Sequence, residues 1–146
     1  MTATSTESRS ETAITPQTAL IYTMVLCSAA DRTMTDSELR TIGDVVRTLP
    51  IFRGFDVKQL TKVARDCASL LARDDGFDTV IALIRQSLPK RLRETAYAVA
   101  CDVVASDLHA EQEELRMLAI LRERLDIERL SAAAIERGAR ARFATI

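Results

Sequence analysis

The acidic stretch Ala29-Ala30-Asp31-Arg32-Thr33-Met34-Thr35-Asp36-Ser37-Glu38-Leu39-Arg40 recurs 76 positions later as Ala105-Ser106-Asp107-Leu108-His109-Ala110-Glu111-Gln112-Glu113-Glu114-Leu115-Arg116. The two copies share Ala, Asp, Glu, Leu and Arg in register, and the residues between these differ. Apolar residues continue at helical spacing after each copy, at Leu39, Ile42, Val45 and Leu49 and again at Leu115, Leu118, Leu121 and Leu125. Two copies of a helix–acidic turn–helix unit predict an internally duplicated helical domain.

The composition favours helices throughout the chain. Its 146 residues are enough for one domain with one apolar core. Only four Gly, three Pro and no Trp are present, whereas the helix formers Ala, Leu, Arg and Glu are abundant. No segment alternates with period two for long enough to predict a strand. We therefore expect an all-α fold, a single compact bundle of about seven helices with an internal pseudo-twofold duplication.

The order of helices follows from their start and stop signals. Residues 1–14 lack apolar periodicity and predict a disordered tail, so the folded domain is expected over residues 15–146. Predicted N-caps precede the first, second, third and last helices, and they are Thr15, Thr35 with Glu38 in a capping box, Asp56 and Asp126. The stretch 96–105 is apolar nearly all round, which is typical of a bundle's central helix.

Charge and hydropathy exclude several classes of function. A net charge of −1 gives no bias toward nucleic acid or acidic lipid, so neither is expected as a partner. No apolar stretch approaches the roughly 20 residues that a membrane helix needs, so direct membrane insertion is not expected. The N-terminus lacks the apolar segment of a secretory signal. Three cysteines without metal-type spacing indicate free thiols and a cytoplasmic location.

The two acidic turns are the first candidate functional site. Asp31 and Asp107 each follow a predicted helix, where the helix dipole disfavours a carboxylate by up to about 1 kcal/mol, and Glu38 and Glu114 lie seven residues further on. Carboxylate and carbonyl oxygens together suit a divalent cation such as Ca²⁺ or Mg²⁺, so these four residues are candidate metal ligands. In the structural alternative, the aspartates bond to turn amides and the glutamates close capping boxes, an explanation that suits Glu38 better than Glu114, because the second turn has no Ser or Thr at the cap.

Asp102 is a further candidate because it lies within the apolar stretch 96–105. A carboxylate there must find a partner or become protonated. It either pairs with an arginine from another helix or adds to the same acidic site as a fifth metal ligand.

Other residues offer weaker signals. His109 is either a nitrogen ligand or an exposed turn residue. Cys27, Cys67 and Cys101 lie on apolar faces and are expected in the core, although a Cys/His nucleophile pair stays open. The basic run 90–93 either recruits an acidic partner or pairs with Glu94 and nearby acidic loops. No phosphate loop, catalytic triad or zinc spacing is present, so we do not expect an enzyme.

Several of these segments resemble the TerB family of tellurite-resistance proteins. In the first half the likeness lies in residues 20–26, running into Ala30-Asp31, and then in 38–40 and 49–52. In the second half it lies in residues 88–89, 92–98, 105–107 and 113–115. The resemblance covers about residues 16–142. The chain departs from the family pattern where the two aspartates are usually followed by Gly, because Arg32 and Leu108 stand there instead.

The resemblance implies a non-enzymatic bacterial adaptor in tellurite and stress resistance. It implies a cytoplasmic location, peripheral to the inner membrane through a TerC-type membrane partner, together with Ca²⁺-binding TerD-type proteins. It also implies a metal role for the turn carboxylates, which carries over to Asp31, Glu38, Asp107 and Glu114. The alternative is a purely structural helical interaction module with no metal site, and a third possibility is a small thiol-dependent enzyme built on Cys101 or Cys27 with His109.

Overall fold

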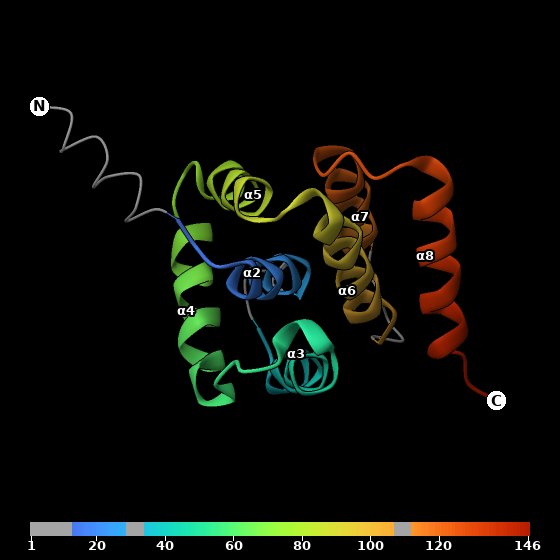
Figure 1. Cartoon of the computed structure of the whole chain (residues 1–146), viewed down its shortest axis with the longest axis horizontal. Coiled ribbons are helices and arrows are strands. Elements are labelled where there is room, and N and C mark those ends of the chain that lie inside the picture. Colours follow the sequence, from blue (N-terminus) through green and yellow to red (C-terminus); the bar gives the residue numbers. More distant parts are fainter. Residues whose placement is uncertain (1–12, 29–33, 107–111) are drawn as a thin grey trace, which may run out of the picture.

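The computed structural model describes residues 13–28, 34–106 and 112–146, and these form an all-helical bundle without strands (Figure 1). Its α-helices are α2 (Pro16–Ser28), α3 (Asp36–Thr48), α4 (Leu60–Leu71), α5 (Gly76–Ser87), α6 (Arg93–Ser106), α7 (Gln112–Arg124) and α8 (Arg129–Arg142). Three short 3₁₀ turns are interspersed, η1 (Pro50–Phe52), η2 (Val57–Gln59) and η3 (Lys90–Leu92). The predicted all-α bundle is confirmed. Most of the predicted tail, residues 1–12, lies outside the described residues.

Helix α2 lies at the centre of the bundle and is surrounded by other helices (Figure 1). Its residues from Ala19 to Ser28 are all buried, because the sequence Ala-Leu-Ile-Tyr-Thr-Met-Val-Leu-Cys-Ser offers almost no polar face. Thr23 tolerates this position because its hydroxyl donates to the carbonyl of Ala19 at 2.8 Å. Helices α3, α4, α5, α6 and α7 all contact α2.

Helix α6 lies beside α2 and is the second largely buried helix of the bundle. It packs along α2 on one face, and α7 and α8 pack on its others, so α8 lies at the edge of the molecule (Figure 1). The stretch 96–105 was predicted as the central helix, and most of its side chains are indeed buried. Only this one central helix was predicted, whereas α2 is the more completely enclosed of the two.

Three of the predicted helix starts are confirmed by hydrogen bonds. Thr15 accepts from the amide of Thr18 at 3.1 Å at the start of α2. Thr35 and Glu38 form a complete capping box at the start of α3. Asp56 accepts from the amide of Lys58 at 3.0 Å, and the chain passes through η2 into α4. Each cap satisfies an amide that the first helical turn leaves unpaired.

The predicted cap at Asp126 is wrong. Asp126 ends α7 rather than starting α8, because it adopts a left-handed conformation with φ of 54°. Its amide bonds to the carbonyl of Glu123, and the next amide, of Ile127, bonds to the carbonyl of Arg122. This is the Schellman arrangement of a helix C-terminus. It allows Leu125 and Ile127 both to face the core, where they are buried.

The carboxylate of Asp126 joins three helices. It accepts from Arg85 of α5 at 2.8 Å and lies 3.8 Å from Arg93 of α6. Arg85 also donates to the carbonyl of Arg124 at the end of α7. An aspartate is therefore used at a left-handed position that would otherwise suit Gly.

The predicted repeat divides the chain into two halves, and the second helix of each half, α3 or α7, lies at an equivalent position. Helices α3 and α7 have the same length and begin 76 positions apart, which is the offset of the repeated sequence. The internal duplication itself stays a prediction. Within the described residues, no helix combines the length and apolar character needed to cross a bilayer.

Gly76 provides a test of the close approach between α4 and α5. A Cβ atom at this position would lie 2.7 Å from the carbonyl oxygen of Leu71 and would also clash with the carbonyl oxygen of Leu70. Because backbone atoms cannot move aside locally, we expect Gly76→Ala to lower the free energy of unfolding by about 1–3 kcal/mol. Urea denaturation measures this change.

The matched control is Gly138→Ala in α8, where an added Cβ would meet only the flexible end of Arg142. This change should be neutral or stabilise by up to about 1 kcal/mol, since Ala favours helix. Equal effects of the two substitutions would show that the α4–α5 corner is not tightly packed.

Candidate functional site at the acidic helix corners

The predicted metal ligands are only partly within the described residues. Asp31 and Asp107 lie outside them, as does His109. Glu38 and Glu114 occupy the third positions of α3 and α7, and both are half-buried. Among the residues that the structure describes, no three acidic, histidine or cysteine side chains are grouped so that they could hold a metal ion.

Glu38 takes part in local capping. Its Oε1 accepts from the hydroxyl of Thr35 at 3.0 Å and from the amide of Thr35 at 3.4 Å, while the amide of Glu38 donates to the Thr35 hydroxyl. The structural alternative predicted these contacts. One carboxylate oxygen of Glu38 is therefore engaged at the start of α3, and a role as metal ligand stays a prediction.

Glu114 lies close enough to the end of α2 to act on it electrostatically. The pKa of the Cys27 thiol is raised, first by burial and then by the neighbouring Cys101 and the negative charge of Glu114. Helices α2, α6 and α7 therefore converge at one corner of the bundle, where α2 ends and α7 begins.

Ser28, the last residue of α2, adds an oxygen at this corner. Its hydroxyl is buried and has no hydrogen-bond partner among the described residues. A buried hydroxyl without a partner costs free energy, so such groups call for an explanation. A hydroxyl oxygen is also a donor of the type that Ca²⁺ and Mg²⁺ accept. Ser28 and Glu114 thus bring oxygen atoms of the type that a hard cation accepts to this corner.

Asp102 pairs with Arg142 of α8. This is the arginine from another helix that the structural alternative predicted, and it explains how a carboxylate is accommodated in an otherwise apolar helix. The Asp102 side chain retains 23% exposure, so the ion pair lies at the edge of the α6–α8 interface. The pair ties the last turn of α8 to α6.

All three cysteines pack in the core as predicted. Cys27, Cys67 and Cys101 are free and buried. Burial raises the pKa of Cys67 to about 12 and is the largest cause of a similar rise, to about 12, at Cys101. The thiols therefore stay protonated at neutral pH, whereas a nucleophilic cysteine needs its thiolate. This weakens the thiol-dependent alternative.

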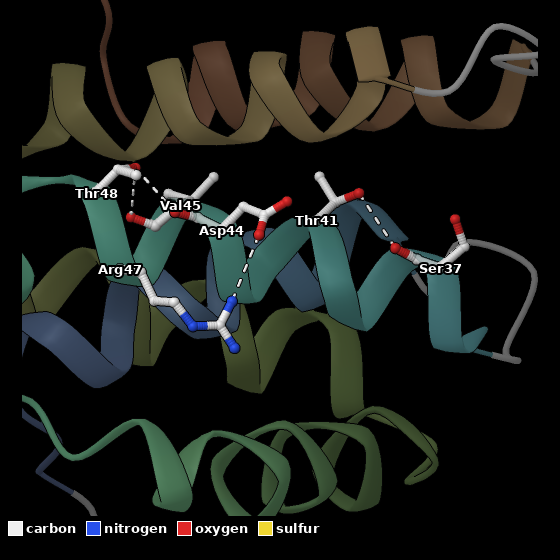
Figure 2. Close-up of polar contacts among 6 residues, drawn as sticks. All are labelled: Ser37, Thr41, Asp44, Val45, Arg47 and Thr48. Atoms are coloured by element: carbon white, nitrogen blue, oxygen red, sulfur yellow. Dashed lines mark hydrogen bonds and ion pairs between the residues drawn. The ribbon is translucent and has the colours of Figure 1, made fainter.

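The polar side chains on the outer face of α3 make hydrogen bonds and an ion pair within that same helix, as Figure 2 shows. Thr41 donates to the carbonyl of Ser37 at 3.2 Å, and Thr48 donates to the carbonyl of Asp44 at 2.9 Å. Arg47 pairs with Asp44 at 3.4 Å within the same helix. These local contacts are typical of a solvated helix surface and give no indication of a binding site.

Of the basic residues in the run 90–93, two are exposed to solvent and one lies near a carboxylate. Lys90 and Arg91 lie in η3 and are exposed. Arg93 instead begins α6 and lies 3.8 Å from the carboxylate of Asp126. Pairing with an acidic loop, one of the two predicted alternatives, therefore accounts for Arg93.

A polar network between α6, α7 and α8 was not predicted from the sequence. The hydroxyl of Tyr97 donates to Glu136 at 2.6 Å, and Arg122 lies 3.6 Å from the same carboxylate oxygen. Burial and this carboxylate raise the pKa of Tyr97. The one available signal was Tyr97 itself, because a tyrosine in an apolar helix needs a partner for its hydroxyl.

The protein is thus a helical bundle with acidic residues at the start of α3 and α7 and with buried thiols. A family model described as tellurite resistance protein TerB matches residues 17–137. The chain therefore belongs to the TerB family of tellurite-resistance proteins. Searches of curated proteins and of solved structures gave no match.

The ion pair between Asp102 and Arg142 can be measured by a double-mutant cycle. We expect Asp102→Asn and Arg142→Gln each to lower the free energy of unfolding. The double variant should lose less than the sum, with a coupling of about 1 kcal/mol, because the pair is partly exposed. Zero coupling would mean that Asp102 is free for another ligand.

The buried thiols predict a loss of stability at high pH. The folded pKa of Cys67 is about 12, above its ordinary value of 9.0, so the folded protein favours the protonated form. The contribution of the buried, protonated Cys67 thiol to the free energy of unfolding is complete below about pH 9 and is lost as the pH rises toward 12. The free energy of unfolding, measured with urea at pH 7.5 and pH 10, should therefore fall at the higher pH.

In Cys67→Ala this fall should be smaller, by at most about 1.4 kcal/mol for each unit between the ordinary pKa and the working pH. An unchanged pH dependence in the variant would show that the Cys67 thiol does not resist ionisation.

Proposed function

We propose that the chain is a non-enzymatic cytoplasmic adaptor in tellurite and stress resistance, and that it binds a divalent cation at its acidic helix corners. The proposed ligands are Asp31, Glu38, Asp107 and Glu114. Membership of the TerB family supports the resistance role. The proposed partners are other tellurite-resistance proteins, including a TerC-type membrane protein that would hold the adaptor at the inner membrane.

The observation that supports the cation most directly is the corner where α2 ends. The negative charge of Glu114 acts on Cys27 in the last turn of α2, and the buried hydroxyl of Ser28 has no partner among the described residues. The C-terminus of α2 carries partial negative charge from the helix dipole. A cation at this helix end would interact favourably with that partial charge and with the carboxylate of Glu114.

The placement of Glu38 and Glu114 adds a second line of support. Each is the third residue of its helix, and the two helices start 76 positions apart. Asp31 and Asp107 precede them by the same seven residues. The sequence thus supplies the same pair of carboxylates twice.

The alternative is a structural interaction module without a metal. It is favoured by the capping box, which already engages Glu38, and by the ion pair of Asp102 with Arg142. Asp102 is accordingly the weakest of the five candidate ligands.

Isothermal titration calorimetry with Ca²⁺, Mg²⁺, Mn²⁺ and Zn²⁺ separates the two functions. We expect the wild type to bind one cation with saturable heat, and the free energy of unfolding to rise by about 2.7 kcal/mol at a hundredfold excess over the dissociation constant. Asp107→Asn combined with Glu114→Gln should abolish both effects.

The matched control is Glu123→Gln, which removes a carboxylate from the last turn of α7 and should leave the binding unchanged. Absence of saturable heat and of any melting shift with all four cations in the wild type would leave the interaction module as the function.

A further inference from the structure

A groove runs between α7 and α8 and has α6 as its floor. Both helices pack on α6 rather than extensively on each other. They leave a cavity of about 320 Å³ between them. Its apolar lining is contributed by all three helices, through Val104, Ala105, Leu115, Leu118, Ala119 and Ala139. The three alanines leave room for side chains or a helix to approach the floor closely.

Leu115 is the exposed edge of this groove. It lies in the first turn of α7 with 54% of its surface accessible, which is unusual for a leucine on the core-facing stripe of an amphipathic helix. Leu39 is the residue at the same position of α3, and it is half-buried. The two helices therefore differ in how well the chain covers the same stripe.

The difference comes from the connections that follow the two helices. Eleven residues, 49–59, connect α3 to α4, and their turns η1 and η2 both lie against α3. Val57 of η2 borders the same hollow as Leu39 and Gly43. Only four residues, 125–128, connect α7 to α8, and they form no such turn. Among the residues that the structure describes, the connection after α3 thus covers the apolar stripe of that helix, whereas the stripe on α7 is left open at Leu115.

The charges in the groove indicate what would cover it. The carboxylate of Glu136 is already compensated by the hydroxyl of Tyr97 at 2.6 Å and by Arg122 at 3.6 Å. Arg140 also lines the cavity, and it makes no ion pair with any described residue. The charge left without a partner in the lining is therefore positive. An occupant that carries a carboxylate beside its apolar side chains would complement it.

We propose that this groove binds an acidic amphipathic helix of a partner protein. Leucine-like side chains of the partner contact Leu115, Leu118 and Ala119, and a flanking glutamate or aspartate pairs with Arg140. This inference rests on the proposed adaptor function and supplies its docking surface. It does not depend on the acidic corners, because none of the proposed cation ligands lines the cavity.

A pair of labelled peptides tests the proposal. Each peptide has about 16 residues, long enough to hold helix in water, with leucines at helical spacing. The acidic peptide has glutamates at the flanking positions, and its twin has lysines there. Fluorescence anisotropy should show saturable binding of the acidic peptide to the wild type and much weaker binding of the basic one.

Two matched pairs of variants locate the binding. Leu115→Glu should raise the dissociation constant at least tenfold, equivalent to about 1.4 kcal/mol, whereas Leu130→Glu alters an exposed leucine outside the groove and should change nothing. Arg140→Glu should weaken binding of the acidic peptide and strengthen binding of the basic one. Arg137→Glu lies outside the lining of the groove and should change neither affinity.

Three results would overturn the proposal. The first is absence of binding of the acidic peptide to the wild type, and the second is an equal effect of Leu115→Glu and Leu130→Glu. The third is a dimer detected by light scattering that Leu115→Glu dissociates, because a second copy would then occupy the groove. Calorimetry with the cations on Arg140→Glu keeps the two hypotheses apart, because this variant changes the groove without adding a carboxylate beside Glu114, and cation binding should persist there whether or not the peptide binds.

Discussion

The burial of α2 is the constraint on which the rest of the bundle depends. Ten consecutive residues, from Ala19 to Ser28, are removed from solvent, so no face of this segment can be left at the surface. Burial of large aliphatic side chains stabilises by about 1.5–3 kcal/mol each, and α2 contributes five of the largest fully buried ones, Leu20, Ile21, Met24, Val25 and Leu26. The other helices must therefore surround it, and their amphipathic faces are what allow them to do so.

The same constraint determines the position of the acidic corner. The hydroxyl of Ser28, at the end of the described part of α2, therefore lies in the interior rather than in water. Glu114 at the start of α7 then approaches the same end from a different helix. The proximity of Glu114 to the end of α2 is thus a product of packing.

Local signals predicted most of the fold. The cap at Thr35 and Glu38, the cap at Asp56 and the apolar stretch 96–105 depend on residues close in sequence, and each was identified correctly. Asp126 was misassigned because its conformation depends on the burial of Leu125 and Ile127, which only the tertiary structure determines. Asp102 and Arg142 are forty positions apart, so the sequence predicted an arginine partner without identifying which one. The groove between α7 and α8 was missed for the same reason, because it depends on which helix pairs do not pack together. The two aspartates of the acidic turns lie outside the described residues, so their part in the site remains a prediction.

The depth at which the thiols lie also limits the kind of ion that the folded protein can accept. Copper(I) and other ions that favour sulfur bind thiolates, and no cysteine of this chain is both accessible and deprotonated near neutral pH. Capture of such an ion by a cysteine would require the core to open first. The folded bundle therefore keeps its three thiols away from ions that favour thiolate ligands.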